Sequence, residues 1–242
     1  MPTPRDVAEF VQALQRAPRL PGIFNQYAQF DPNLDASSSA PDVRCEQLHQ
    51  YLSDRLGHAK LCLQAEAAGY QGARFSGIPM TSERILLGHH DVPKDIVMKA
   101  TTKRTSRMTA PKGVRIPSNG FTEPTASIVW RSIRDSGASS VKVVLANTFP
   151  FHPLGPKGPL SNGRPCAEHL VATRGLLEHF YRLFPNVLIV PVGRVAEATL
   201  QGLGVPSQPY VRHPAYRGAN EFRQGMASYY AAVNLRQPAG RP

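Results

Sequence analysis

The sequence predicts an α/β fold, a three-layer α/β/α sandwich around a central four-stranded parallel sheet. Two observations support this prediction. Four short runs are apolar at nearly every position, which is typical of strands buried on both faces. Helical patterns separate these runs along the chain, as in a sheet whose parallel strands are joined by crossover helices. The strands are expected at 59–65, 140–146, 186–192 and 209–213.

The first expected helices precede the first strand. An amphipathic pattern covers 7–15, and a second covers 43–56 with Asp42 as its expected cap. Further helical patterns lie at 123–136, 167–184, 193–203 and 220–233, the last with Asn220 as a candidate cap. We expect a single domain over 1–242, with a helical extension at 1–58 and a basic loop inserted at 89–122.

The charge of the chain favours a polyanionic partner. Lys and Arg number 28 against 17 Asp and Glu, a net charge of +11, which suggests nucleic acid, although a generally basic solvated surface is the alternative. No acid occurs from Ile96 to Thr122. Lys103, Arg104 and Arg107 fall in this stretch, so we expect a loop that contacts phosphates; a solvated insertion is the alternative.

Several function classes receive no support. No segment is apolar over the length of a bilayer, and the first residues lack a signal-peptide core. Three cysteines without CxxC spacing predict a reducing cytosol and no disulfide framework. They are also too few for the usual iron–sulfur ligand set. His89 and His90 lack ligand spacing, so no metal or other cofactor is expected.

Polar and small residues follow the expected strands. The run LCLQA leads into Glu66, and then Ala67, Ala68 and Gly69 follow. Residues this small after a buried strand indicate that something approaches the backbone closely. The next strand leads into NTFPFHP and the last into RHPAYRG. Because ligands of open parallel sheets bind beyond the carboxyl ends of the strands, these segments predict a site.

Together the three segments resemble the uracil-DNA glycosylase superfamily in motif type and order. The matching stretches are Ala65-Glu66-Ala67-Ala68-Gly69, then Phe75-Ser76, then Asn147 in NTFPF, and finally His213-Pro214-Ala215. The run VLIVPVGRVA is similar to a strand-to-helix turn of the iron–sulfur branch, and the resemblance extends from about Lys60 to the final helix. Each motif is short, but three in the right order, each closing an expected strand, are more specific.

The sequence also departs from the superfamily pattern. Ala65 and Ala68 stand where glycine and proline are usual, and Ala67 stands where the superfamily carries its strongest catalytic acid. The cluster cysteines are absent, so the resemblance points to a cluster-free branch. It implies a monofunctional uracil-DNA glycosylase, a hydrolase that starts base excision repair on DNA containing uracil or another damaged base. We further expect a monomeric, bacterial, cytoplasmic and nucleoid-associated protein.

Three residues are expected to hold the extracted base. Phe75 offers a flat apolar face, although a core phenylalanine is the alternative. The Asn147 amide can donate to a carbonyl and accept from a ring N–H, a pattern that fits uracil; it could instead satisfy local backbone. A neutral His213 can stabilise charge that develops on the leaving base; a structural histidine is the alternative.

The reacting sugar and water need further groups. Glu66 is the candidate acid for the sugar cation and the attacking water, with Gln71 as a second water-orienting candidate. A salt-bridged or capping Glu66 is the alternative. Ala67 and Gly69 allow close approach of the nucleotide. Because Gly69 occupies the position where strict uracil enzymes carry a tyrosine, and Tyr70 comes one residue later, 5-substituted uracils or other deaminated bases could enter.

The segment after His213 is expected to enter the minor groove. Tyr216 or Arg217 could fill the gap left by the flipped base, and Arg217 could meet phosphate; a plain loop to the last helix is the alternative. Two rival functions stay open, a nucleic-acid-binding protein of the same fold without catalysis and a hydrolase of another N-glycoside. The basic loop disfavours the second rival, since a free nucleotide needs fewer positive charges.

Overall fold

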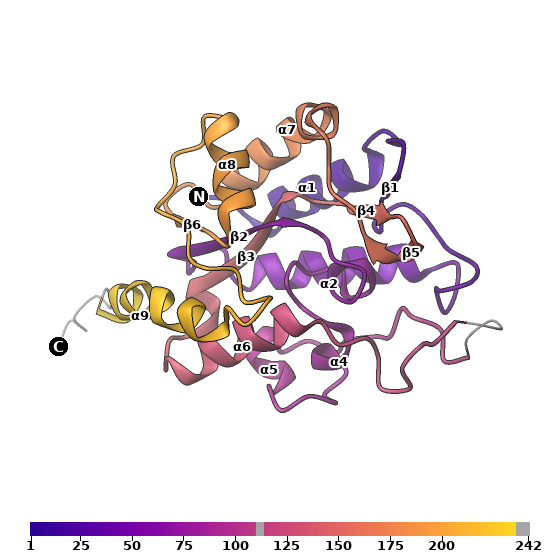
Figure 1. The fold of residues 1–242 in the computed structure, drawn as a ribbon, viewed down its shortest axis with the longest axis horizontal. Coiled ribbons are helices and arrows are strands. Elements are labelled where there is room, and N and C mark those ends of the chain that lie inside the picture. Colours follow the sequence, from indigo (N-terminus) through magenta and orange to yellow (C-terminus); the bar gives the residue numbers. More distant parts are fainter. Residues whose placement is uncertain (110–113, 236–242) are drawn as a thin grey trace.

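The central sheet lies between two layers of helices in the computed structural model, which describes residues 1–109 and 114–235. Its strands are parallel and run in the order β3-β2-β6, with β2 at Leu61–Ala67, β3 at Val143–Phe149 and β6 at Leu188–Pro191. Figure 1 shows α1, α7 and α8 on one side of this sheet and α2, α6 and α9 on the other. The predicted α/β layering is therefore present.

The prediction of a fourth strand at 209–213 is wrong, because the described sheet has three strands. In the described chain, this segment pairs through an isolated parallel bridge between Val192 and Val211. The Val211 amide donates to Pro191 at 2.9 Å, and its carbonyl accepts from Gly193 at 2.8 Å. Pro209 and Pro214 flank the bridge, and proline has no N–H with which to extend a ladder.

The long helices lie close to their expected ranges. They are α1 at Pro4–Arg16, α2 at Ala40–Ser53, α6 at Pro124–Asp135, α7 at Ala167–Leu183, α8 at Arg194–Gly202 and α9 at Ala219–Leu235. Short helices occur at Ala73–Ser76 (α3), Glu83–Leu86 (α4) and Lys94–Val97 (α5), with a 3-10 turn at Ser140–Lys142. Asp42 lies in the first turn of α2 rather than at its cap, and Asn220 lies within α9.

A second, small antiparallel sheet was not predicted from the sequence. It joins β1 at Ile23–Phe24, β4 at His152–Gly155 and β5 at Gly158–Asn162, in the order β1-β4-β5. Prolines interrupt the apolar pattern of β4 and β5, so neither reads as a strand. This hairpin follows β3 directly and places Asn162 beside the loop after β2.

One apolar cluster forms the main core. It extends from Val7 of α1 through the strands of the central sheet to Val233 of α9. Side chains of α1 and α2, such as Phe10 and Leu48, belong to the same cluster. The helices before residue 58 therefore pack on the sheet and cover the edge where β3 lies.

Candidate functional site

Asn147 lies near the end of β3 with its side-chain oxygen unused. The residue is 7 % exposed, and Oδ1 is buried without a hydrogen-bond partner among the described residues. A buried amide oxygen left without a partner is destabilising by about 1–3 kcal/mol. Such a group needs an explanation, and an amide held in readiness for a ligand is one.

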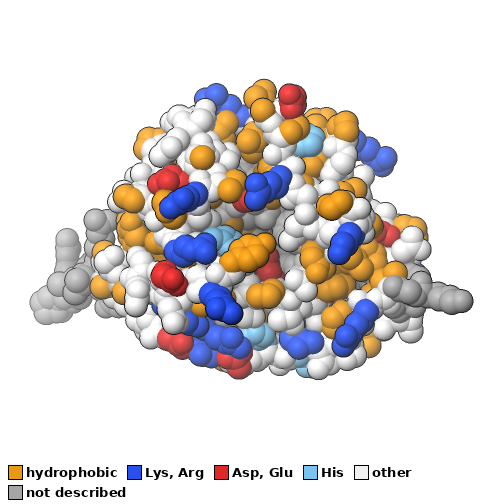
Figure 2. Space-filling model, in the orientation of Figure 1, with side chains coloured by type: hydrophobic (Ala, Val, Ile, Leu, Met, Phe, Trp, Pro, Cys, Tyr) orange, Lys and Arg blue, Asp and Glu red, His pale blue; other side chains and the backbone are white. Residues whose placement is uncertain are grey.

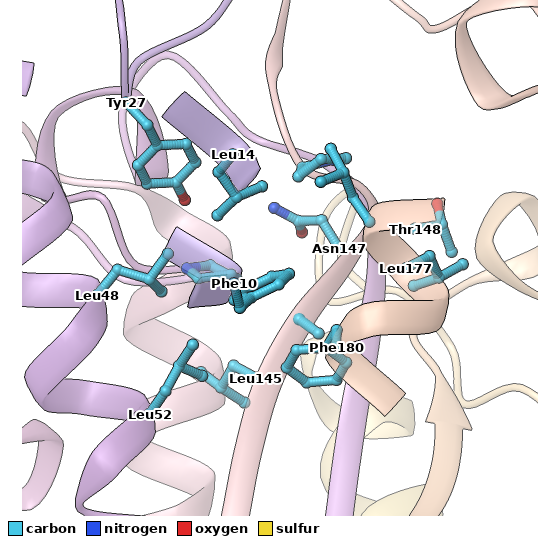
Figure 3. Close-up of a pocket in the computed structure, with 14 residues that line it drawn as sticks. Phe10, Leu14, Tyr27, Leu48, Leu52, Leu145, Asn147, Thr148, Leu177 and Phe180 are labelled. Carbon is cyan, nitrogen blue, oxygen red and sulfur yellow. The ribbon is translucent and has the colours of Figure 1, made fainter. Parts of the chain in front are cut away.

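A narrow cavity adjoins Asn147 at the edge of the sheet. Figure 3 shows the amide pointing from β3 into this cavity toward Leu14 and Tyr27. The lining is mostly apolar and comes from α1, α2, α7 and β3; it includes Phe10, Leu14, Leu48, Leu145, Leu177 and Phe180. Its volume is about 40 Å³, which accommodates a few waters. A base would need the cavity to widen.

The register of β2 and β3 separates Glu66 from Asn147. Asn147 pairs with Ala65, so these two side chains and that of Ala67 share one face of the sheet. Glu66 alternates to the other face with Gln64, whose side chain meets Tyr181 of α7 at 3.3 Å. The structure therefore brings Glu66 and Asn147 to the same end of the sheet but to opposite faces.

Glu66 is a half-buried acid. Burial raises the pKa of its carboxyl, and the positive charge of Arg164 opposes this. Its backbone carbonyl accepts a hydrogen bond from the hydroxyl of Thr148 at 2.7 Å. The side chain is thus available for chemistry, but on the face away from Asn147.

The loop after β2 is fixed by backbone contacts from elsewhere in the fold. The Ala68 amide donates to the carbonyl of Phe151, and the Ala68 carbonyl lies 2.9 Å from Nδ1 of the buried His152. The Tyr70 amide donates to Oδ1 of Asn162 at 2.9 Å. The side chains of Tyr70 and Gln71 are partly buried. The loop is therefore held beside the segment that follows Asn147.

Glu123 approaches this loop, which the sequence did not reveal. A β-carbon at Gly69 would lie 2.7 Å from Oε1 of Glu123, and one at Gly72 would overlap Oε2. The two glycines therefore make room for a carboxyl group. Oε2 is buried without a hydrogen-bond partner in the described chain. Burial raises the pKa of this carboxyl to about 7.

Phe75 is fully enclosed in the structure. It is 0 % exposed, stacks on Phe121 with ring centroids 4.4 Å apart, and has the Arg74 guanidinium 4.6 Å from its centroid. Arg74 is itself fixed by an ion pair with the buried Asp35 at 2.9 Å. This packing is that of a core phenylalanine, and its contact with a base stays a prediction.

His213 is half-buried beside the turn that ends β6. A β-carbon at Gly193 would lie 3.1 Å from the β-carbon of His213. Burial and the nearby Arg212 lower the pKa of the imidazole, so the ring is neutral at pH 7. The Ala215 amide donates to Nδ1 at 3.1 Å, which places the proton of the neutral ring on Nε2. His213 therefore presents an N–H donor.

The loop after His213 projects into solvent. Tyr216 is 94 % exposed, and both Tyr216 and Arg217 have positive φ angles of 53° and 64°. Two consecutive non-glycine residues in the left-handed region are uncommon and are found mainly where structure serves a site. An exposed aromatic on a strained loop fits the predicted insertion between bases, which no observation tests.

The basic loop uses part of its charge internally. Arg104 donates to the backbone carbonyls of Ser106, Arg107, Pro117 and Ser118. Arg107 donates to the carbonyl of Pro32 at 2.6 Å, and Lys103 lies 3.4 Å from Glu46 at the surface. Figure 2 shows blue basic side chains spread over the whole face, with few red acids among them. Phosphate contacts by Lys103, Arg104 and Arg107 stay a prediction.

The described residues contain no group of three His, Cys, Asp or Glu side chains that could hold a metal ion. In the same part of the chain, no helix is long and apolar enough to cross a membrane. All three cysteines are free, with Cys45 and Cys62 buried and Cys166 exposed.

Comparison with known proteins gives a fold-level relative. No protein-family model matches the sequence, and no curated protein matches it. Among solved structures, the fold is similar to the crystal structure of wild-type SMUG2 from Pedobacter heparinus, with a TM-score of 0.61 and 13 % sequence identity. The match covers 95 % of this chain and 98 % of that one. At this identity the likeness shows the fold alone.

Proposed function

We propose that this protein is a DNA glycosylase that flips uracil out of DNA and hydrolyses its N-glycosidic bond, which would start base excision repair. The fold supports this proposal, because its structural neighbour SMUG2 is a member of the uracil-DNA glycosylase superfamily. The observation that carries it is the buried Asn147 amide at the carboxyl end of a parallel strand, whose oxygen has no hydrogen-bond partner among the residues that the structure describes.

The proposed chemistry uses Asn147 and His213 on the base. Asn147 donates to a uracil carbonyl and accepts from the ring N–H, a combination that cytosine does not offer. As the glycosidic bond breaks, negative charge develops on the base. The Nε2–H of neutral His213 stabilises that charge, and its lowered pKa keeps the imidazole neutral at physiological pH. The narrow cavity beside Asn147 must widen to admit the base.

An oligonucleotide with a single uracil tests the proposal. Alkali after incubation should break the strand with the wild-type protein, and Asn147→Ala or His213→Ala should lower the excision rate by at least about 100-fold. Exposed Glu221→Gln on α9 serves as a matched control with unchanged activity. A wild-type protein that leaves uracil and other deaminated bases intact would overturn the proposal.

A catalytically inactive DNA-binding protein is the second candidate. The observation in its favour is Ala67, since no acid of β2 lies on the Asn147 face. In that case the wild-type protein would bind the uracil oligonucleotide, with affinity falling as salt rises, yet leave the base in place. The same assay therefore separates the two candidates.

A further inference from the structure

Glu123 is an acid at the start of a helix that does not cap that helix. It occupies the N-cap position of α6, directly before Pro124, yet its side chain makes no cap hydrogen bond. Short polar side chains at this position, such as Asp or Ser, ordinarily accept a hydrogen bond from the first free amides of the helix, whereas glutamate is not among the preferred caps. Here the carboxyl is turned toward the loop after β2 instead, against Gly69 and Gly72.

Charged side chains of α3, α4 and β2 are held or influenced by groups other than Glu123. Arg74 of α3 pairs with Asp35, and Glu83 of α4 accepts from the amides of residues 105 and 106. Glu66 at the end of β2 is influenced by Arg164. Burial raises the pKa of Glu123, and no charged group of the described residues contributes to this shift. Among the described residues, Glu123 therefore has no ion partner that would account for the position of its carboxyl.

Glu123 also supplies an acid on the side of the sheet where β2 carries none. The face of β2 shared with Asn147 carries Ala65 and Ala67 and no acid. Gln64, on the opposite face of β2, meets Tyr181 of α7, and Figure 1 shows α2 and α6 together on the other side of the sheet from α7. Glu123 thus comes from the layer on the Asn147 side, whereas Glu66 faces the opposite layer.

We propose that the carboxylate of Glu123 activates the water that attacks the sugar, in place of an acid on β2. This assignment rests on the glycosylase function proposed above. The water oxygen forms a bond to C1′ of the deoxyribose as the bond from C1′ to the base nitrogen breaks. The bonding pair leaves with the base, whose oxygen accepts a hydrogen bond from His213. Glu123 takes the proton of the water and passes it, through solvent, to the departing base.

Single-turnover excision of uracil tests this assignment with Glu123→Gln, which keeps the shape of the side chain but cannot take a proton. The rate should fall by at least about 100-fold while DNA affinity stays within about threefold. In the wild-type protein the excision rate should rise with pH through about 7, the pKa of this carboxyl. The Glu123→Gln variant should lack this pH dependence.

A second variant, Glu123→Ala, separates loss of the acid from misfolding and from a merely structural role of the side chain. Glu123→Ala leaves space for a small acid, so added formate should restore part of the lost rate, with no effect on the wild type or on Asn147→Ala. An active wild type, together with a Glu123→Gln rate within about threefold of it, would overturn the role of Glu123 and leave the glycosylase proposal intact. An inactive wild type would instead overturn the glycosylase proposal, and the assignment with it.

Discussion

Replacing Glu123 by glutamine should change how the stability of the protein depends on pH. Burial raises the pKa of this carboxyl from 4.5 to about 7 in the folded chain. An acid with a raised pKa binds more protons in the folded state than in the unfolded state. It therefore favours folding fully below about pH 4.5, and this contribution is lost as pH rises through about 7. Glutamine does not titrate, so the stability of the variant should not fall with pH for this reason.

The magnitude follows from the difference of about 2.5 between the two pKa values. At about 1.36 kcal/mol for each pKa unit, ionisation destabilises the wild-type fold by about 3 kcal/mol at high pH. Roughly 2.5 kcal/mol of this falls between about pH 5 and pH 8. Over that interval, the melting temperature of the variant should therefore rise by roughly 5–10 °C relative to the wild type.

Urea unfolding at several pH values measures this difference. All other titrating groups are common to both proteins, so subtracting the two free energies of unfolding isolates Glu123. Glu221→Gln, at an exposed position of α9, should show a difference that is independent of pH within about 0.5 kcal/mol. A similarly flat difference for Glu123→Gln would show that the carboxyl is solvated, and the reasoning from its burial would be wrong.

Three further changes test the site and its surroundings. Gly72→Ala should destabilise the fold by about 1–3 kcal/mol through overlap with Glu123, and by much less in a Glu123→Ala background; equal losses in a double-mutant cycle of chemical unfolding would exclude the contact. Tyr216→Ala should leave the free energy of unfolding within about 0.5 kcal/mol of the wild type, because the side chain is exposed. It should slow excision from duplex DNA more than from single strands, and equal slowing on both would rule out insertion between bases. Excision of 5-hydroxymethyluracil, compared with uracil in the wild type and Tyr70→Ala, measures the predicted tolerance of the base pocket; strict uracil preference in both proteins would contradict it.

Local patterns predicted the helices and the central strands well, and long-range contacts explain the failures. Amphipathic and fully apolar runs are local signals, so the positions of α1, α7 and β2 were close to those expected. The hairpin of β4 and β5 was not predicted because prolines interrupt its strand pattern. Segment 209–213 was predicted as a strand from its apolar residues, but its flanking prolines limit backbone pairing to one bridge. Each miss concerns backbone pairing rather than side-chain pattern.

The candidate site shows the same division between local and tertiary information. Small residues after β2 predicted a close approach of the nucleotide to the backbone, which stays a prediction, and in the structure the Glu123 carboxyl lies against Gly69 and Gly72. The identity of a partner distant in sequence is tertiary information that one chain does not display. The available signal was that Glu123 ends a long acid-free stretch next to a proline, at a helix start. Glu66 was expected in one site with Asn147, but side chains alternate along β2 and that of Glu66 lies on the other face.

A structural and a catalytic role for Glu123 predict opposite relations between stability and activity. If the carboxyl only held the loop in place, its replacement would lower the stability and the activity of the protein together. The observed carboxyl instead has no hydrogen-bond partner for Oε2 in the described part of the chain, and burial raises its pKa to about 7. Both features disfavour folding. Residues kept at such a cost typically serve function, and their replacement stabilises the fold while lowering activity. A Glu123→Gln protein that is more stable than the wild type at pH 8 and slower on uracil would therefore distinguish the catalytic role, whereas parallel losses would indicate a structural one.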